Sequence, residues 1–272
     1  MLSIHWEARV KIVISSGCLA LLLISCSSAE LEKEIEGTFE RSKATSYREG
    51  ERLPWAVGQW ALFRITETGS ETFFRAFSSE TRGIREYAIT GAEGSAFWLE
   101  VREVWPDEET RCAFLVDNVD PKRMQDVRVV RSKLLEPDGE VLEFGEGEDP
   151  PSEVRDLQDK WMVLAKALPL SEGTGRVRPL AVPAGRFEES FAVPVSISVL
   201  TGSTAGSVWF TSAVPIFYSA QQYSLSRSWV WARTGMLYEL VDFGTEGARS
   251  FFSPEGLKKT TQADERAGGD KT

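Results

Sequence analysis

The alternation of apolar and polar positions predicts that most of the chain between residues 53 and 253 forms β-strands. In residues 95–105, Phe97, Leu99 and Val101 recur at every second position, which is the period of a strand with one buried face. Similar segments, rich in aromatic and branched side chains, are residues 58–69, 110–117, 126–136, 140–145, 185–200, 208–226 and 228–244. These segments predict a mainly β domain.

Short turn-forming stretches separate several of these segments. Residues 105–110, 117–122 and 136–140 each contain proline together with aspartate. Strands that are joined by such short turns run antiparallel. The sequence therefore predicts one antiparallel β domain over residues 53–253, which is within the usual size of a single domain.

One segment, residues 150–170, has the period of a helix instead. Ser152 is suited to cap the first turn, and Pro169 is suited to end the helix. A single apolar face would then contain Val154, Leu157, Trp161, Leu164 and Leu168. We expect this helix to cover an open face of the sheet, either as a permanent part of the core or as a lid over a ligand cavity.

The first residues have the pattern of a secretory signal. Arg9 and Lys11 precede an apolar run that ends at Ser25. Residues 23–26, "LISC", resemble the bacterial lipobox, which implies cleavage after Ser25 and acylation of Cys26. The alternative is an ordinary secretory signal followed by a chance cysteine. Two or three acyl chains would hold the protein on a bilayer.

The lipobox resemblance also implies a location. Ser27 follows the cysteine where an aspartate would favour the inner membrane, so we expect anchoring to the outer membrane, facing the periplasm. Residues 1–25 are then a signal peptide and residues 26–52 a lipidated, charged tether. Residues 254–272 lack apolar periodicity and are expected to be a disordered tail.

Charge and composition narrow the function. The formal net charge is −10, which argues against nucleic acid as a partner. The only histidine, His5, lies in the predicted signal, so the processed chain could form neither a Ser-His-Asp triad nor a His-containing zinc site. Cys112 would be the only free thiol, and its alternating apolar neighbours favour a buried structural role. We expect that the protein is not an enzyme and binds no cofactor. Catalysis by a carboxylate pair or by a lysine-activated serine is the remaining alternative.

An acidic run precedes the predicted helix. Glu146, Glu148 and Asp149 lie close together in it, and carboxylates are ligands for calcium. Their spacing does not match the familiar calcium-binding loop. A solvated acidic loop is therefore the preferred interpretation, and no metal site is expected.

Several short motifs occur in a familiar order. They are "VGQWALFRI" (residues 57–65), "FWLEVREVWPDEET" (97–110), "VPAGRF" (182–187), "VWFTSAVPIFYS" (208–219) and "ELVDFG" (239–244). Over residues 55–245 they resemble a family of uncharacterised bacterial envelope proteins. The resemblance implies a fold similar to the LolA/LolB lipoprotein-carrier superfamily: a curved, incomplete antiparallel β-barrel with helices across its open side. Ser219 replaces a frequent glycine, and Gln221 or Gln222 a frequent lysine, and no catalytic residue is implied.

Two functions follow as hypotheses. In the first, the half-barrel binds a lipid or another apolar ligand, lined by Trp60, Trp98, Trp161, Trp209 and Trp229. The alternative for each tryptophan is an ordinary core position. In the second, the protein is a structural or assembly lipoprotein that docks another envelope protein through an acidic surface or an apolar patch.

Overall fold

A computed structural model describes residues 46–48, 50–70, 78–167, 176–199, 202–228 and 233–253. Several predictions lie outside these residues. They are the signal peptide with Ser25, the lipidated Cys26, the tail, Trp229, and the last helical position, Leu168. Within the described ranges, no helix is long and apolar enough to cross a membrane.

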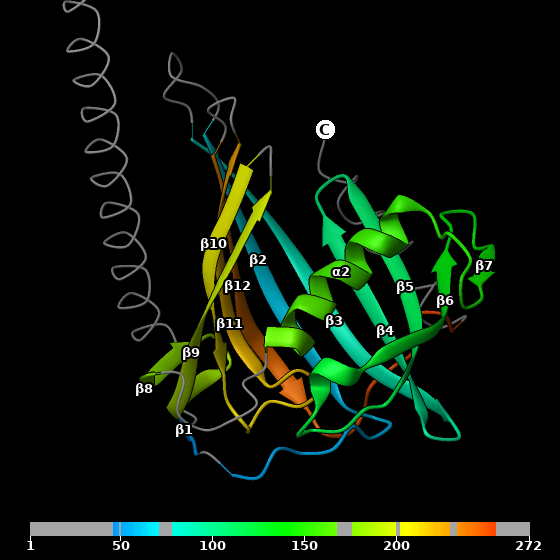
Figure 1. Cartoon of the computed structure of the whole chain (residues 1–272), viewed down its shortest axis with the longest axis horizontal. Coiled ribbons are helices and arrows are strands. Elements are labelled where there is room, and N and C mark those ends of the chain that lie inside the picture. The colour runs from blue at the N-terminus through cyan, green and yellow to red at the C-terminus, as the bar shows by residue number, and fades with distance from the viewer. Residues whose placement is uncertain are drawn as a thin grey trace, which may run out of the picture.

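The described residues form twelve β-strands in one curved sheet (Figure 1). The strands are β1 (Ser46–Tyr47), β2 (Trp60–Ser70), β3 (Ser78–Glu93), β4 (Ala96–Trp105), β5 (Glu108–Asp117), β6 (Arg128–Leu135), β7 (Val141–Phe144), β8 (Arg176–Val182), β9 (Gly185–Val199), β10 (Gly202–Phe210), β11 (Ser219–Ser228) and β12 (Arg233–Gly244). Their order is β1-β9-β10-β11-β12-β2-β3-β4-β5-β6-β7, with β8 paired to β9. The mainly β prediction is confirmed.

All of these pairs are antiparallel except the short β1–β9 pair. Among the described strands, β7 at one end of this order does not pair with β1, β8 or β9 at the other end. The sheet is therefore open. The helix α2 (Ser152–Ala167) crosses the concave face, as predicted (Figure 1). A short 3-10 helix, η1 (Met124–Asp126), precedes β6.

Bulges and glycines allow the sheet to curve. The register shifts between Ile89 and Gly91, between Leu115 and Val116, and within β10 and β12. Such bulges increase the local twist of a strand. At Gly206, a Cβ atom would lie 1.9 Å from the carbonyl oxygen of Tyr223, so only glycine allows β10 and β11 to approach this closely.

The apolar face of α2 is buried against the sheet. Val154, Leu157, Trp161 and Leu164 are all 3% exposed or less. The Trp161 ring stacks on Phe217 at a centroid distance of 5.8 Å and contacts Phe114 at 5.6 Å. The helical stripe read from the sequence is therefore the face that covers the core.

Residues 211–218, here called the base plug, fill one end of the concave face. Phe217 contacts both Trp55 and Tyr87, at centroid distances of 5.8 and 5.1 Å. Ile216 has a φ of 68°, which is strained for a β-branched residue. Its carbonyl accepts a hydrogen bond of 2.8 Å from the Trp55 indole, which holds the strained backbone in place.

The described part of the predicted tether lies against the β domain. The Ser46 hydroxyl donates to Glu188 over 2.7 Å, and β1 pairs with β9 at Arg186 and Phe187. The Gly50 amide donates to the Ser212 hydroxyl over 2.7 Å. The chain therefore contacts the β domain from Ser46 onward. The alternation of apolar and polar residues in the sequence begins only at about residue 53.

Candidate functional site

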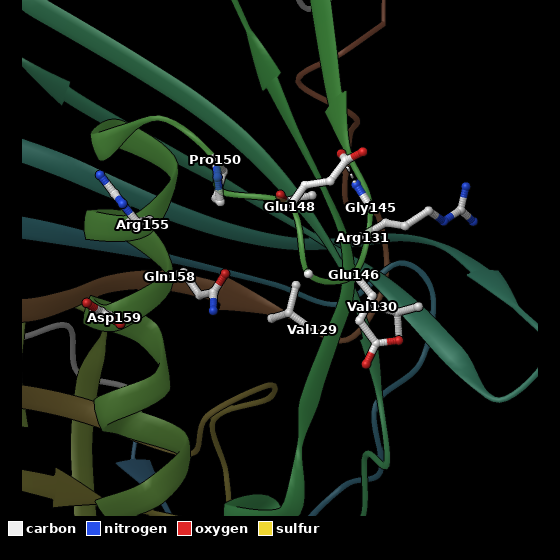
Figure 2. Close-up of a pocket in the computed structure, with 12 residues that line it drawn as sticks. Val129, Val130, Arg131, Gly145, Glu146, Glu148, Pro150, Arg155, Gln158 and Asp159 are labelled. Atoms are coloured by element: carbon white, nitrogen blue, oxygen red, sulfur yellow. Dashed lines mark hydrogen bonds between the residues drawn. The ribbon is translucent and has the colours of Figure 1, made fainter.

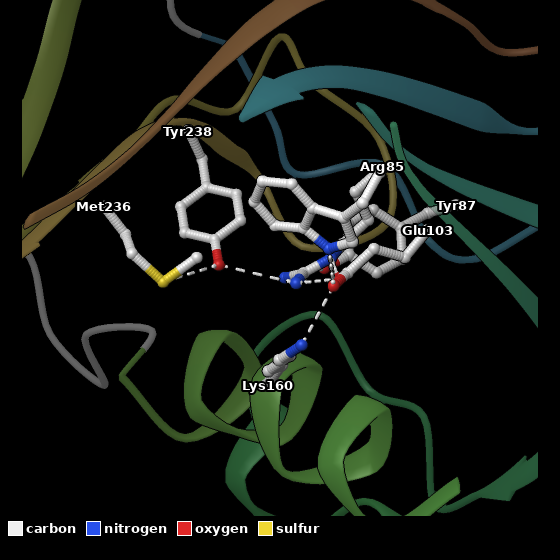
Figure 3. A network of polar contacts seen from close by, with 7 residues as sticks. Arg85, Tyr87, Glu103, Lys160, Met236 and Tyr238 are labelled. Atoms are coloured by element: carbon white, nitrogen blue, oxygen red, sulfur yellow. Dashed lines mark hydrogen bonds and ion pairs between the residues drawn. The ribbon is translucent and has the colours of Figure 1, made fainter. Parts of the chain in front are cut away.

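The concave face carries a charged cluster, here called the Arg85 network (Figure 3). Arg85 of β3 donates through Nε to Glu103 of β4 over 2.7 Å. The other oxygen of Glu103 accepts bonds from Lys160 of α2, at 3.0 Å, and from the Trp105 indole, at 2.8 Å. One carboxylate therefore joins two strands and the helix.

Tyrosine side chains enclose the Arg85 guanidinium. Its central carbon lies 4.7 Å from the centre of the Tyr238 ring, a cation–π geometry. Its terminal nitrogens lie 3.5 Å from the Tyr87 hydroxyl and 3.4 Å from the Tyr238 hydroxyl. Arg85 is only 2% exposed, so these groups replace the water that a free guanidinium would bind.

The network keeps its charges despite burial. Burial alone would raise the pKa of Glu103, but Arg85, Lys160 and the Trp105 indole lower it below its ordinary value. Burial would lower the pKa of Arg85, yet Tyr87, Tyr238 and Glu103 raise it. Burial raises the pKa of both tyrosines, which therefore stay neutral at neutral pH. Two cations thus share one carboxylate.

Solvent reaches the network through Lys160. The Lys160 side chain is 39% exposed, whereas that of Glu103 is 6% exposed. The network has different neighbours on its two sides.

On one side, Tyr87 contacts Phe217 of the base plug. On the other side, the inward face of β12 continues from Tyr238 to Met236 and Thr234.

Beyond Tyr238 the concave face is polar; we call this part the hydroxyl wall. Tyr238 pairs with Gln222, and Gln222 pairs with the core residue Val208, so these three side chains lie on the same, inward face of the sheet. Every second residue along each strand from these positions also faces inward. The hydroxyls of Thr204 and Ser226 lie 2.9 Å apart there. The wall contains the partly exposed residues Thr204, Gln222, Ser224, Ser226 and Thr234.

The structure does not bring the predicted tryptophans together. Trp161 lies in the core of the concave face, and its buried indole nitrogen has no hydrogen-bond partner among the described residues. Trp60 and Trp98 lie on the convex face, since Ala61, Phe63 and Leu99 beside them point into the core. Their indoles donate to the carbonyl of Glu246 and the carboxylate of Glu93, respectively.

The remaining two tryptophans do not extend a lining. Trp209 is partly buried, packs against the core, and lies on the opposite face of β10 from Val208. Trp229 lies outside the described residues. Among the described tryptophans of the predicted set, only Trp161 faces the concave side. Period-2 alternation decides on which face of a strand a side chain lies, and the sequence pattern alone did not show which face of the sheet the helix covers.

Sequence reasoning missed Arg85 and Glu103. A signal was present: Arg85 occurs two residues before Tyr87, and Glu103 two residues after Val101, each in line with buried apolar positions. A charge on the apolar side of a strand requires a partner. Direct pairing of Arg85 with Glu103 in the β3–β4 register provides it.

A groove of about 310 Å³ lies between α2 and the edge of the sheet (Figure 2). Val129 points into it from β6, opposite Gln158 of α2. β7 pairs with β6 only over Ser132–Leu135. Among the described strands, Arg128, Val129 and Arg131 of β6 therefore have a partner only on the β5 side, and Val130 is the extra residue of a β-bulge there.

The surroundings of this groove are acidic. From Glu143 to Asp159 the chain has seven carboxylates and one cation, Arg155. Two of these carboxylates, Glu143 and Glu146, pair with Arg128, Arg131 and Lys133 of β6. Arg155 pairs with Asp149 at 2.7 Å, whereas Asp159, which lines the groove, forms no hydrogen bond or ion pair with the described residues. In the described ranges, no three acidic, histidine or cysteine side chains are grouped as a metal site.

Cys112 has the environment expected of a structural residue. It is fully buried, and burial raises the pKa of its thiol to about 12, with Glu153 and Glu103 adding to the effect. The thiolate is the nucleophilic form of cysteine, so this side chain is unreactive at neutral pH.

The chain matches no protein-family model, and no curated protein is significantly similar to it. The described residues offer three candidate features, the Arg85 network, the hydroxyl wall and the groove, which differ in accessibility and charge.

Proposed function

We propose that the protein is a membrane-anchored envelope lipoprotein whose β domain binds an amphiphilic ligand on its concave face without catalysing a reaction. The observation that carries the binding function is the Arg85 network: a charged cluster on the concave face, open to solvent at Lys160. The anchor rests on the "LISC" sequence and the acylation that it implies for Cys26.

Stability alone is a weak reason for such a cluster. Buried ion pairs gain little net stability over well-packed apolar residues, because desolvation offsets their attraction. Lys160 has three donors, and the structure shows one acceptor for it, Glu103. Its ammonium is therefore available to a polar head group that approaches along the concave face.

The ligand we propose is amphiphilic, not wholly apolar. Met236 and Trp105 are partly buried beside the network and would contact an apolar part. The hydroxyl wall and Lys160 would contact a polar part. The order of the motifs in residues 55–245 resembles a family of uncharacterised bacterial envelope proteins. The resemblance implies a fold similar to the lipoprotein-carrier superfamily, which supports the same class of function.

Mass spectrometry of the full-length lipoprotein extracted from its membrane tests the binding function. We expect a co-purifying amphiphile that is reduced in Lys160→Ala and retained in Lys166→Ala, an exposed lysine in the last turn of the same helix. Absence of a bound molecule, or equal retention in both variants, would argue against this site.

Detergent partitioning tests the anchor independently. Cys26→Ala should move the protein from the detergent phase to the aqueous phase or leave it unprocessed, because the acylated thiol is lost. Ser27→Ala is the matched control, since it lies outside the four-residue motif. Equal partitioning of the wild type and Cys26→Ala would refute acylation at Cys26.

A second candidate function is docking of another envelope protein. The observation that favours it is the groove beside β6, with an incompletely paired strand on one side and an acidic helix on the other. This surface is separate from the Arg85 network, so the two functions are compatible in one molecule.

A further inference from the structure

We propose that the incompletely paired edge of β6 binds an extended, basic segment of a partner protein by strand addition. This inference rests on the docking function proposed above and names the chemistry of the partner. The site is the groove between residues 129–132 of β6, the loop 145–150, and Arg155, Gln158 and Asp159 of α2 (Figure 2).

Half of the outer edge of β6 has no partner strand among the described strands. β6 runs from Arg128 to Leu135, and β7 covers the half of its outer edge that starts at Ser132. An uncovered edge presents N–H and C=O groups that pair readily with another extended chain. A segment in the groove would continue the row of β7 along the edge of β6.

The walls of the groove come from both β6 and α2. The partly buried side chain of Val129 packs against the core and forms an apolar contact point, and Gln158 faces it from α2 (Figure 2). An added strand would thus have β6 on one side and the helix on the other. This combination of main-chain pairing and side-chain contacts is how strand addition gains both affinity and specificity.

The charge of the groove also bears on the partner. Arg128, Arg131 and Lys133 of β6 pair with Glu146 and Glu143, and Arg155 pairs with Asp149. Glu148 and Asp159, which line the groove, have no ion pair with the described residues. A basic segment is complementary to this surface. A second copy of the chain is disfavoured, because a symmetric contact would place the same acidic rim against itself.

Fluorescence anisotropy with the full-length protein and synthetic ten-residue peptides tests the proposal. An alternating Lys/Val peptide should bind, whereas an alternating Glu/Val peptide should not. A Lys/Val peptide with two central prolines keeps its charge but cannot pair along a strand. It should bind much more weakly, and equal binding of the two basic peptides would leave only a non-specific charge effect and overturn the proposal.

Charge variants of α2 provide the matched control. Asp159→Lys changes a groove residue, whereas Asp156→Lys makes the same charge change at an exposed position that does not line the groove. We expect Asp159→Lys to weaken binding of the Lys/Val peptide by roughly tenfold or more, as for a close charge pair across an interface, and Asp156→Lys to weaken it much less. Equal effects would overturn the assignment of the site.

A photo-crosslinking residue at Val130, which lines the groove, separates this proposal from the docking function itself. In cells, we expect crosslinks to a lysine- or arginine-rich extended segment, identified by mass spectrometry of the joined peptides. A crosslinked partner whose joined segment is helical or acidic would leave docking intact and refute strand addition. A crosslink to a second copy of this chain refutes the proposed partner, and no crosslink at all refutes docking at this groove.

Discussion

The two parts of the concave face use the same strands but have opposite chemistry. At the base, Phe217 of the base plug contacts Tyr87 and Trp161, and all three side chains are buried. Beyond Tyr238, most inward positions of β10, β11 and β12 belong to the partly exposed hydroxyl wall, and Met236 is an apolar residue among them. The Arg85 network lies at the boundary between these two parts.

This difference bears on where the proposed ligand would bind. A packed aromatic base leaves no room for a ligand unless α2 moves, because close-packed interiors have few voids. The exposed Lys160 and the hydroxyl wall are accessible without such a movement. We therefore expect substitutions at the base to affect mainly stability, and substitutions at the network and the wall to affect binding of the proposed ligand.

The largest expected effect is at the base. Trp161→Ala should lower the free energy of unfolding by about 3–5 kcal/mol, because it removes a fully buried indole that stacks on Phe217. Denaturant titration of the ligand-free protein measures this loss. Trp98→Ala, on the convex face, is the matched control and should cost less. A loss of only about 1–2 kcal/mol for Trp161→Ala would instead identify α2 as a mobile lid.

Removing Arg85 from the network should lower the stability by a comparable amount, and a second substitution should recover much of this loss. Arg85→Met leaves Glu103 buried with less compensation and should cost about 3 kcal/mol. The double variant Arg85→Met, Glu103→Leu removes both charges and should recover much of this loss. If the double variant is as unstable as the single one, the pair does not act as a coupled unit. Thermal or denaturant unfolding gives both values.

The network should also contribute to acid sensitivity. The folded-state pKa of Glu103 is lowered below its ordinary 4.5, so its stabilising contribution is present above the unfolded-state value and is lost as the pH falls through the folded-state value. The free energy of unfolding of the wild type should therefore decrease as the pH is lowered below about 4.5. The decrease should be smaller in Glu103→Gln, which has no carboxylate to protonate at this position. Identical pH profiles of the two proteins would contradict the assignment.

The smallest effect on stability is expected at the hydroxyl wall. Thr204→Val removes one hydroxyl of a partly exposed pair and should cost less than about 1 kcal/mol, since water can replace the lost contact with Ser226. The amount of co-purifying amphiphile should nevertheless fall. A large loss of stability without any change in the bound ligand would reverse the roles assigned to the two parts.

Several features of the fold were readable from local patterns. Period-2 alternation predicted the strands of residues 95–105 and 110–117, and the helical stripe predicted α2 together with its buried side chains Val154, Leu157 and Trp161. These features depend on neighbours that are close in sequence, so their signals survive without tertiary information. The base plug interrupts the segment of residues 208–226 that the alternating pattern had predicted as strand, and it contains Pro215, which cannot donate to a strand ladder.

The sequence by itself determined the mainly β class, the antiparallel connections, the covering helix α2, and the absence of histidine from residues 26–272. Only the tertiary structure decided which face of each strand is covered, and it separated Trp60 and Trp98 from Trp161. It also brought Arg85, Glu103 and Lys160 together and left the edge of β6 incompletely paired. The physical reason is that strand register and helix docking join residues far apart in the chain, and a one-residue change of register would exchange the two faces of a strand.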